Sequence, residues 1–220
     1  MKIKIDGKKL NPANSVNYLG ITIDPHLNWH INAIQLYLKL SRSIGMLSKI
    51  RHFVDHKTLI MIYHGIFSSK LLYGSQIWGQ GSNKSIIKIH KLQNKALRII
   101  NFKPFNADVN ELYKSTKILK LCDSIKLNNF LFSHDNINNN LPSVLLNSLV
   151  AVDFTKTRSF EYRQLKIPKV RTKCFGTNSI KSKSVEIWNI LNKKFHEEKF
   201  YSKSKKGCKI FISQAFLDEY

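Results

Sequence analysis

The stretch from Lys84 to Ile100, KSIIKIHKLQNKALRII, decides both the local fold and the kind of partner expected for this chain. Its cations recur at steps of four, three, four and three residues, which places them on one side of an α-helix. These five residues, called the basic stripe below, are Lys84, Lys88, Lys91, Lys95 and Arg98. The apolar residues of the stretch fall on the opposite side, so the pattern predicts a helix with one face in a core.

No acidic residue interrupts the basic stripe. Like charges four residues apart on a helix each cost about a few tenths of a kcal/mol, so a solvated helix usually mixes in glutamate. The pattern therefore leaves two interpretations open. The stripe is either a basic outer face that keeps the protein in solution, or a surface that follows a polyanion such as a nucleic-acid backbone.

The composition indicates a folded and strongly basic protein. The 220 residues suffice for one large or two small domains, and the 43% of apolar residues exclude a disordered tail. The 36 Lys and Arg against 14 Asp and Glu give a net charge of +22, and both halves of the chain are cationic. Such a charge attracts polyanions. We expect no membrane partner, because the apolar faces have the pattern of a core and no stretch has the length of a transmembrane span.

Motifs of enzymatic chemistry are missing from the sequence. Cys122, Cys174 and Cys208 lack zinc-ligand spacing and are predicted to be reduced intracellular thiols. His26 and His30 lie four residues apart without an evident third ligand. There is no glycine-rich phosphate loop, no hydrolase motif and no pair of adjacent aspartates that could hold two Mg²⁺ ions. We therefore predict no catalytic residues, metal site or cofactor in this chain.

Patterns along the chain predict a mainly α fold with a small N-terminal β hairpin or sheet (α+β). Residues 1–27 form the β segment, residues 28–102 a three-helix bundle, and residues 103–220 a smaller helical region. Within the last part, segment 153–178 lacks periodicity and interleaves cations with aromatic residues. That mixture suits either unpaired nucleic acid or a long basic loop. A helix is also expected from Leu141 to Val152.

The β segment is predicted from short alternating stretches. A hairpin that turns at Asp6-Gly7 precedes a single strand from Val16 to Ile23. Gly20 within that strand indicates a bulge or a close approach by another backbone. Asp24 or Asn28 is expected to cap the helix that follows.

The bundle is predicted as three helices joined by short links. The first runs from Asn28 to about Arg51, with an expected apolar stripe of Ala33, Tyr37, Leu40, Ile44 and Leu47, widened by Ile34 and Leu38. Its other side carries a weaker basic face of Lys39, Arg42 and Lys49, together with Ser43. The second helix, Lys57 to Leu72, is apolar nearly all round and is expected to be the buried centre. The third carries the basic stripe.

Five stretches of the chain resemble one family in content and order. They are YLGITIDPHLNW (Tyr18–Trp29), SRSIGMLSKIRHFV (Ser41–Val54), LLYGSQIWG (Leu71–Gly79), HKLQNKALRII (His90–Ile100) and RTKCFGTNSIKSKSVEIWNIL (Arg171–Leu191). Together they resemble the C-terminal part of the reverse transcriptase of non-LTR (LINE, jockey-like) retrotransposons, from the end of the palm through the thumb to the C-terminal extension. Each motif is loose by itself, whereas five in the right order are specific.

The resemblance implies a role for each part. Tyr18, Leu19 and Gly20 match the family's primer-grip turn, residues 28–102 match the thumb that holds the template–primer duplex, and the remainder matches the C-terminal extension. It also implies a sequence-independent nucleic-acid partner and a nuclear location. The palm aspartates that would hold Mg²⁺ are not in this sequence, so we expect a truncated copy that does not polymerise DNA by itself.

Two other interpretations of the sequence stay open. The chain could be a stand-alone basic RNA- or DNA-binding protein without catalytic activity. It could also be a structural fragment whose charge is inherited and has no function.

Overall fold

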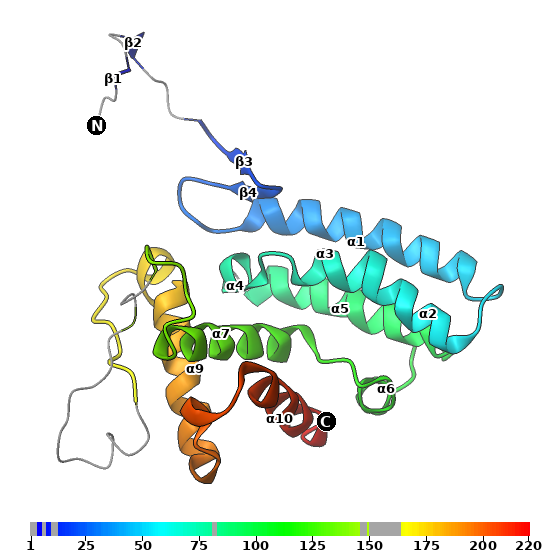
Figure 1. The fold of residues 1–220 in the computed structure, drawn as a ribbon. Coiled ribbons are helices and arrows are strands. Elements are labelled where there is room, and N and C mark those ends of the chain that lie inside the picture. Colours follow the sequence, from blue (N-terminus) through cyan, green and yellow to red (C-terminus); the bar gives the residue numbers. More distant parts are fainter. Residues whose placement is uncertain (1–3, 6–7, 10–12, 81–82, 146–148, 150–163) are drawn as a thin grey trace.

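The computed structural model describes residues 4–5, 8–9, 13–80, 83–145, 149 and 164–220. These residues form a mainly helical structure with two short antiparallel strand pairs at the N-terminal end, which confirms the predicted fold class (Figure 1). The strands are β1 (Lys4–Ile5), β2 (Lys8–Lys9), β3 (Val16–Tyr18) and β4 (Ile21–Ile23). The α-helices are α1 (His30–Ile50), α2 (His56–Tyr63), α3 (Ser69–Leu72), α4 (Ser75–Trp78), α5 (Asn83–Ile100), α6 (Asn110–Thr116), α7 (Leu121–Ile137), α9 (Ile180–Lys194) and α10 (Lys205–Asp218). Short π-helices are η1 (His64–Ser68) and η2 (Lys173–Thr177), and short 3₁₀-helices are η3 (His196–Glu198) and η4 (Phe200–Ser202).

The N-terminal β segment consists of two hairpins. β1 pairs with β2 as predicted, although the expected turn at Asp6-Gly7 lies outside the described residues. The predicted single strand from Val16 to Ile23 is wrong, because β3 and β4 pair with each other. Leu19 and Gly20 form the turn between them, with φ of 48° and 79°. Two successive positive φ angles are the requirement of a tight type I′ hairpin, and glycine supplies only the second of them at no steric cost.

The bundle is built from α1, the continuous helical run α2–η1–α3, and α5. α1 and α5 pack against each other more extensively than any other pair of elements. The α2–η1–α3 run is not the buried centre that we predicted, since Met61 is exposed and the run buries one stripe of residues. That stripe is Leu59, Tyr63, Phe67 and Leu71. An α-helix has fewer than four residues per turn, so residues spaced four apart drift around it. A π turn contains more residues, and η1 therefore helps this stripe to stay on one side of the helical run.

The predicted inner face of α1 is correct only in part. Four of its expected core residues are buried, namely Ala33, Leu40, Ile44 and Leu47, and Leu36 joins them. Ile34, Tyr37 and Leu38 are instead exposed. α1 begins at His30, and neither Asp24 nor Asn28 caps it through its side chain. The Asp24 carboxylate instead accepts hydrogen bonds from the backbone N–H groups of the turn before the helix.

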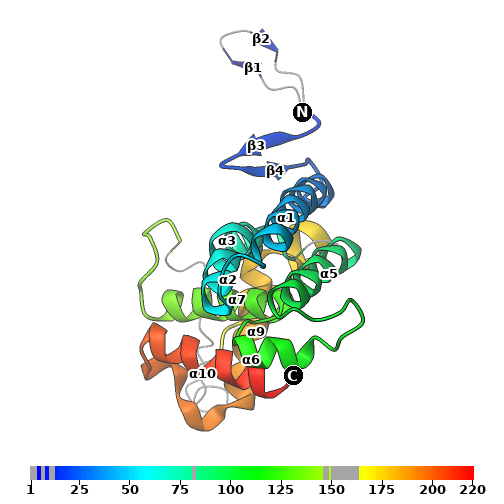
Figure 2. The same ribbon diagram turned by 90° about the vertical axis from the view of Figure 1, so that its right-hand side faces the viewer.

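The apolar residues form two clusters that meet along α7. The first fills the bundle and continues into the chain after α5, where it takes in Tyr113, Ile118, Leu121 and Ile125. The second lies between α7, α9 and α10 and includes Phe130 stacked on Trp188 with ring centroids 4.8 Å apart. In both views α7 lies between the bundle and α10 (Figures 1 and 2). The domain boundary after residue 102 stays a prediction, because buried side chains cross it.

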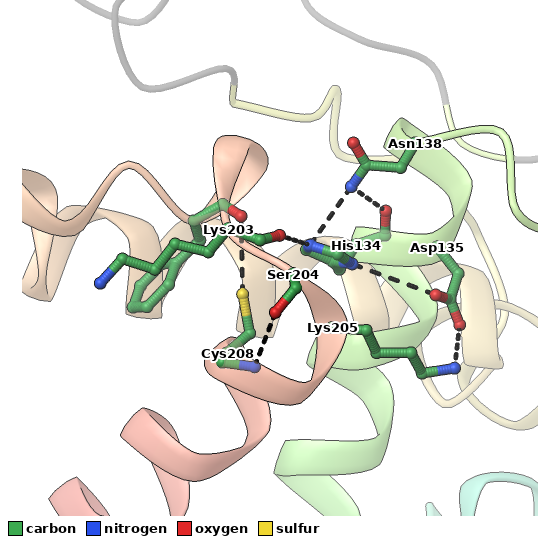
Figure 3. Close-up of polar contacts among 9 residues, drawn as sticks. His134, Asp135, Asn138, Lys203, Ser204, Lys205 and Cys208 are labelled. Carbon is green, nitrogen blue, oxygen red and sulfur yellow. Dashed lines mark hydrogen bonds and ion pairs between the residues drawn. The ribbon is translucent and has the colours of Figure 1, made fainter.

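Polar contacts fasten the C-terminal helix to the end of α7 (Figure 3). The Lys205 ammonium lies 2.6 Å from the Asp135 carboxylate, and the His134 Nε2 atom lies 2.9 Å from the carbonyl oxygen of Lys203. The Ser204 hydroxyl caps α10 by accepting a hydrogen bond from the backbone N–H of Gly207. α10 was not predicted, since its apolar residues follow a lysine-rich start that contains a glycine.

Two further predictions concern the C-terminal region. The helix expected from Leu141 does not begin there, because residues 141–145 form a bend and a turn; most of its remaining length lies outside the described residues. In the basic segment 153–178, residues 153–163 also lie outside them. The described part is irregular up to Thr172 and then forms η2, a π turn that we had not predicted. No helix of the described residues is both long and apolar enough to cross a membrane.

Candidate nucleic-acid interface

The basic stripe lies on one side of α5, as its spacing predicts. Lys84, Lys88, Lys91 and Lys95 are exposed, whereas Arg98 is half-buried. Ile89, Leu92, Ala96, Leu97 and Ile100 are the buried side of the same helix. Among the described residues no carboxylate forms an ion pair with any of the four lysines. Their charges therefore face solvent and are available to an external anion.

A groove of about 800 Å³ runs between α1 and α5. Its α5 wall carries four members of the basic stripe, namely Lys88, Lys91, Lys95 and Arg98. Its α1 wall carries His30, Ala33, Ile34, Tyr37 and Leu38, and Phe105 also lines the groove. No acidic side chain lines it. The exposed apolar residues of α1, which we had predicted to be core, thus face the lysines across an open groove.

Arg98 differs from the four lysines because its side chain contacts other residues of the chain. Its Nε atom donates a 2.9 Å hydrogen bond to the carbonyl oxygen of Ala107, and its guanidinium lies 5.7 Å from the centroid of the Phe105 ring. Arg98 therefore positions the loop after α5 at one end of the stripe. The sequence did not distinguish it from the four lysines.

The weaker basic face of α1 does not join the basic stripe. Lys39, Arg42 and Lys49 are exposed, but none of them lines the groove. Lys39 lines a second, smaller cavity of about 380 Å³ beside the β3–β4 hairpin. Arg42 and Lys49 line neither space. Ser43, expected on this face, is buried and donates a hydrogen bond to the carbonyl oxygen of Ile66.

The β3–β4 turn, which the resemblance predicts to be a primer grip, lines the smaller cavity. Leu19 and Gly20 line it, while Tyr18 and Leu19 are largely exposed. The Asn17 side chain accepts a hydrogen bond from the backbone N–H of Gly20. On the next strand, Thr22 donates a 2.7 Å hydrogen bond from its hydroxyl to Gln35 of α1. The hairpin is therefore fixed to α1.

Two residues of the smaller cavity were missed from the sequence. Lys70 lines it and donates a 3.0 Å hydrogen bond to the Ser43 hydroxyl, and Tyr73 reaches the hairpin turn from the corner between α3 and α4. A lysine inside an otherwise apolar helical stretch was the available signal. The cavity therefore brings together the exposed turn and two cations, Lys39 and Lys70.

Groups suited to metal binding do not gather among the described residues. No three His, Cys, Asp or Glu side chains of the described ranges come close enough to hold a metal ion. Cys122 and Cys208 are free thiols.

Comparison with known proteins finds relatives among the polymerases of mobile elements. The chain is 29% identical over 128 residues to the RNA-directed DNA polymerase from mobile element jockey of Drosophila melanogaster, a match that covers 56% of this chain and 14% of that protein. It is 28% identical over 116 residues to the probable RNA-directed DNA polymerase from transposon X-element of the same fly, covering 51% and 13%. With the probable enzyme from transposon BS the identity is 26% over 124 residues, covering 53% and 13%.

These matches are partial on both sides. The chain spans about one seventh of the length of the curated relatives that it matches, since 13–14% of each is covered. No family model matches the chain, and no solved structure does. Over about half of its length, this chain is a partial homologue of the RNA-directed DNA polymerases of jockey-like non-LTR transposons.

Proposed function

We propose that this chain is a thumb-like segment of a non-LTR RNA-directed DNA polymerase that holds a template–primer duplex and adds no nucleotides by itself. The observation that carries the proposal is the line of four exposed lysines on α5, which face solvent without a partner carboxylate among the described residues. The named relatives support nucleic acid as the anion. By analogy with these relatives we also propose that the chain is located in the nucleus. Fluorescence microscopy of the tagged chain tests this location.

The length of the stripe suits a run of phosphates. At a rise of 1.5 Å per residue, Lys84 and Lys95 lie roughly 16 Å apart along the helix axis. Successive phosphates on one strand are about 3.4 Å apart along a duplex axis, so several of them lie within reach. Lysines are flexible point charges that contact phosphates and not base edges, and binding should therefore be independent of sequence.

The hairpin turn and the smaller cavity are the second part of the proposal. We assign Tyr18, Leu19 and Gly20 the task of steadying the primer end, because the turn is exposed and is hydrogen-bonded to the bundle that carries the stripe. Lys39 and Lys70, which line the adjacent cavity, supply positive charge beside that turn. Arg42 and Lys49 are assigned a general electrostatic contribution only.

The salt dependence of binding tests the proposal. The purified chain is titrated with a fluorescent RNA·DNA hybrid at several salt concentrations. Changing Lys88, Lys91 and Lys95 to glutamine should flatten the slope of log K against log[salt] by roughly 0.7–0.9 for each lost phosphate contact. The matched control changes Lys193, Lys206 and Lys209, three exposed lysines of α9 and α10, to glutamine.

The two triple variants have the same net charge, so their difference isolates the stripe. Equal slopes for both would show that only the overall charge matters and would refute the assignment to α5. Two hybrids of unrelated sequence should bind equally well. Primer extension with Mg²⁺ and deoxynucleotides should be undetectable, and measurable extension by the purified chain would refute the non-catalytic part of the proposal.

A further inference from the structure

Three phenylalanines are exposed at one end of the bundle. Phe53 in the loop between α1 and α2 is 85% exposed, and in the loop after α5 Phe102 and Phe105 are 51% and 82% exposed. Single exposed apolar residues are common on protein surfaces, but exposed aromatic rings on two neighbouring loops make a candidate binding surface. We call these three residues the aromatic end.

Contacts between the two loops hold them together as one surface. The Arg51 guanidinium lies 5.5 Å from the centroid of the Phe102 ring, and the His52 ring meets the same ring edge-on at 6.1 Å. His56 shares a 3.1 Å hydrogen bond with the Asn101 side chain. Residues some fifty positions apart in sequence therefore form the same end of the bundle.

The charged groups around the aromatic end favour an anionic ligand. Arg51, Lys57 and Lys103 lie in or beside the two loops, and Glu111 in the first turn of α6 is the acidic residue beside the second loop. Asp55 is the acidic residue of the first loop, and its carboxylate caps α2 by accepting hydrogen bonds from the backbone N–H groups of Lys57 and Thr58. The Asp108 carboxylate of the second loop accepts a 3.3 Å hydrogen bond from the backbone N–H of Asn110, the first residue of α6. Both loop carboxylates are thus engaged with helix starts.

The aromatic end also continues the basic stripe. Arg98, the last residue of the stripe, lies over the Phe105 ring, and Phe105 itself lines the groove between α1 and α5. A nucleic-acid strand whose phosphates follow the lysines of α5 would therefore reach the Phe105 ring beyond the end of the helix.

We propose that the aromatic end binds unpaired nucleotides by stacking their bases on Phe53 and Phe105, while neighbouring cations hold their phosphates. Exposed aromatic rings interleaved with Arg and Lys are the usual means by which proteins bind single-stranded nucleic acid without sequence preference. Stacking needs bases that are free of a duplex, so this site takes a different ligand from the duplex proposed for the lysines. The approach of a strand along the lysines of α5 rests on the proposed function, whereas stacking on the rings is tested separately from duplex binding.

The test uses three probes with the full chain: a fluorescent 12-nucleotide oligouridine, an abasic oligomer with the same number of phosphates, and a blunt duplex. Oligouridine should bind at least about five-fold more tightly than the abasic strand, because each stacked base contributes a several-fold gain in affinity. The variant with Phe53→Leu and Phe105→Leu keeps apolar surface but loses the rings. It should bind oligouridine about five-fold or more less tightly, with duplex and abasic affinities unchanged.

Two further variants make the result specific. Phe53→Trp with Phe105→Trp should keep oligouridine binding, because indole stacks at least as well as benzene. Ile210→Ala, at an exposed position of α10, should change nothing. Equal binding of oligouridine and the abasic strand would overturn the proposal, as would an unchanged oligouridine affinity in the leucine variant. The exposed rings would then be better explained as a surface for a protein partner. A parallel loss of duplex affinity would also overturn the proposal, since the rings would then belong to the duplex site.

Discussion

The hydroxyl of Tyr73 donates a 2.7 Å hydrogen bond to the carbonyl oxygen of Leu19, which lies 54 positions earlier in the chain. Leu19 is in the turn between β3 and β4, and Tyr73 is at the corner between α3 and α4. At that corner Gly74 leaves room for Ile21, since a Cβ on Gly74 would lie 2.3 Å from the Ile21 side chain. The bundle therefore contributes to the position of the hairpin turn, in addition to the pairing of its two short strands.

Removing that hydrogen bond should loosen the turn. Tyr73→Phe keeps the ring and deletes the donor, and we expect the free energy of unfolding to fall by about 0.5–1 kcal/mol, because the group is partly exposed. Amide hydrogen exchange at Gly20 and Ile21 should accelerate, while exchange in α5 should not change. Tyr18→Phe is the control, since the Tyr18 ring is exposed in the same hairpin. Equal exchange rates in both variants would contradict the positioning role of Tyr73.

The β3–β4 hairpin shows why part of the fold could not be predicted. The stretch VNYLGITI alternates as a strand does, and its turn contains leucine at a positive φ, which bulky residues rarely adopt. Tyr73 contacts the turn, while Asn32 and Gln35 contact Thr22 on β4, and the sequence does not show that these residues lie near the hairpin. In α5, by contrast, the long amphipathic pattern alone predicted the helix and its four exposed lysines correctly, although Arg98 is half-buried.

The ionisation of Asp24 should make the free energy of unfolding fall as the solution becomes acidic. Burial raises the pKa of its carboxyl, but hydrogen bonds from the backbone N–H groups of Asn28, Trp29 and His26 outweigh this and hold the pKa below its usual value. The ionised form therefore stabilises the fold. Its contribution is complete above the unfolded-state pKa, near 3.8, and is lost as pH falls through the lower folded value.

The variant Asp24→Asn measures this contribution. At pH 7 we expect its free energy of unfolding to be about 1–2 kcal/mol lower than that of the parent chain, because an amide replaces a charged acceptor of several hydrogen bonds. The difference should shrink as pH falls below about 4. Denaturant unfolding at pH 7, 5 and 3 follows it, with Asp218→Asn at an exposed position as the control. A difference that stays constant with pH would disprove the role of ionisation.

Gln93 should be the most sensitive polar residue of α5. It is buried, its side-chain amide donates to the carbonyl oxygen of Leu119, and its side-chain oxygen accepts from the backbone N–H of Leu121, both at 2.9 Å. Gln93→Ala leaves these buried groups unpaired, and we expect a loss of about 2 kcal/mol in thermal or urea unfolding. Gln214→Ala, on the exposed side of α10, should change stability by less than about 0.5 kcal/mol. Equal effects of the two changes would contradict this.

The residues of the candidate interface could be predicted where they lie on a single helix. They could not be predicted where the interface depends on how two elements pack together. Lysine spacing on α5 identified the stripe, because periodicity on a single helix reports its faces. The opposite wall of the groove was mistaken for core, since Ile34, Tyr37 and Leu38 are apolar and their exposure depends on how α1 lies against α5. Lys39 and Lys70 come together only through the packing of α1 on α3, which the sequence does not encode locally.

Cys208 should react as a buried thiol. It has no exposed surface, its S–H donates to the carbonyl oxygen of Phe200, and burial raises the pKa of the thiol to about 11. Because the folded pKa exceeds the usual thiol value of 9.0, the neutral thiol stabilises the fold, and this contribution is lost as pH rises from about 9 to about 11. At pH 8 iodoacetamide should modify the exposed Cys122 well before Cys208, as mass spectrometry of peptides would show. Urea should remove the difference, because Cys208 then reacts from the unfolded chain. Equal labelling of the two thiols in native buffer would mean that α10 is not packed on α7 in solution.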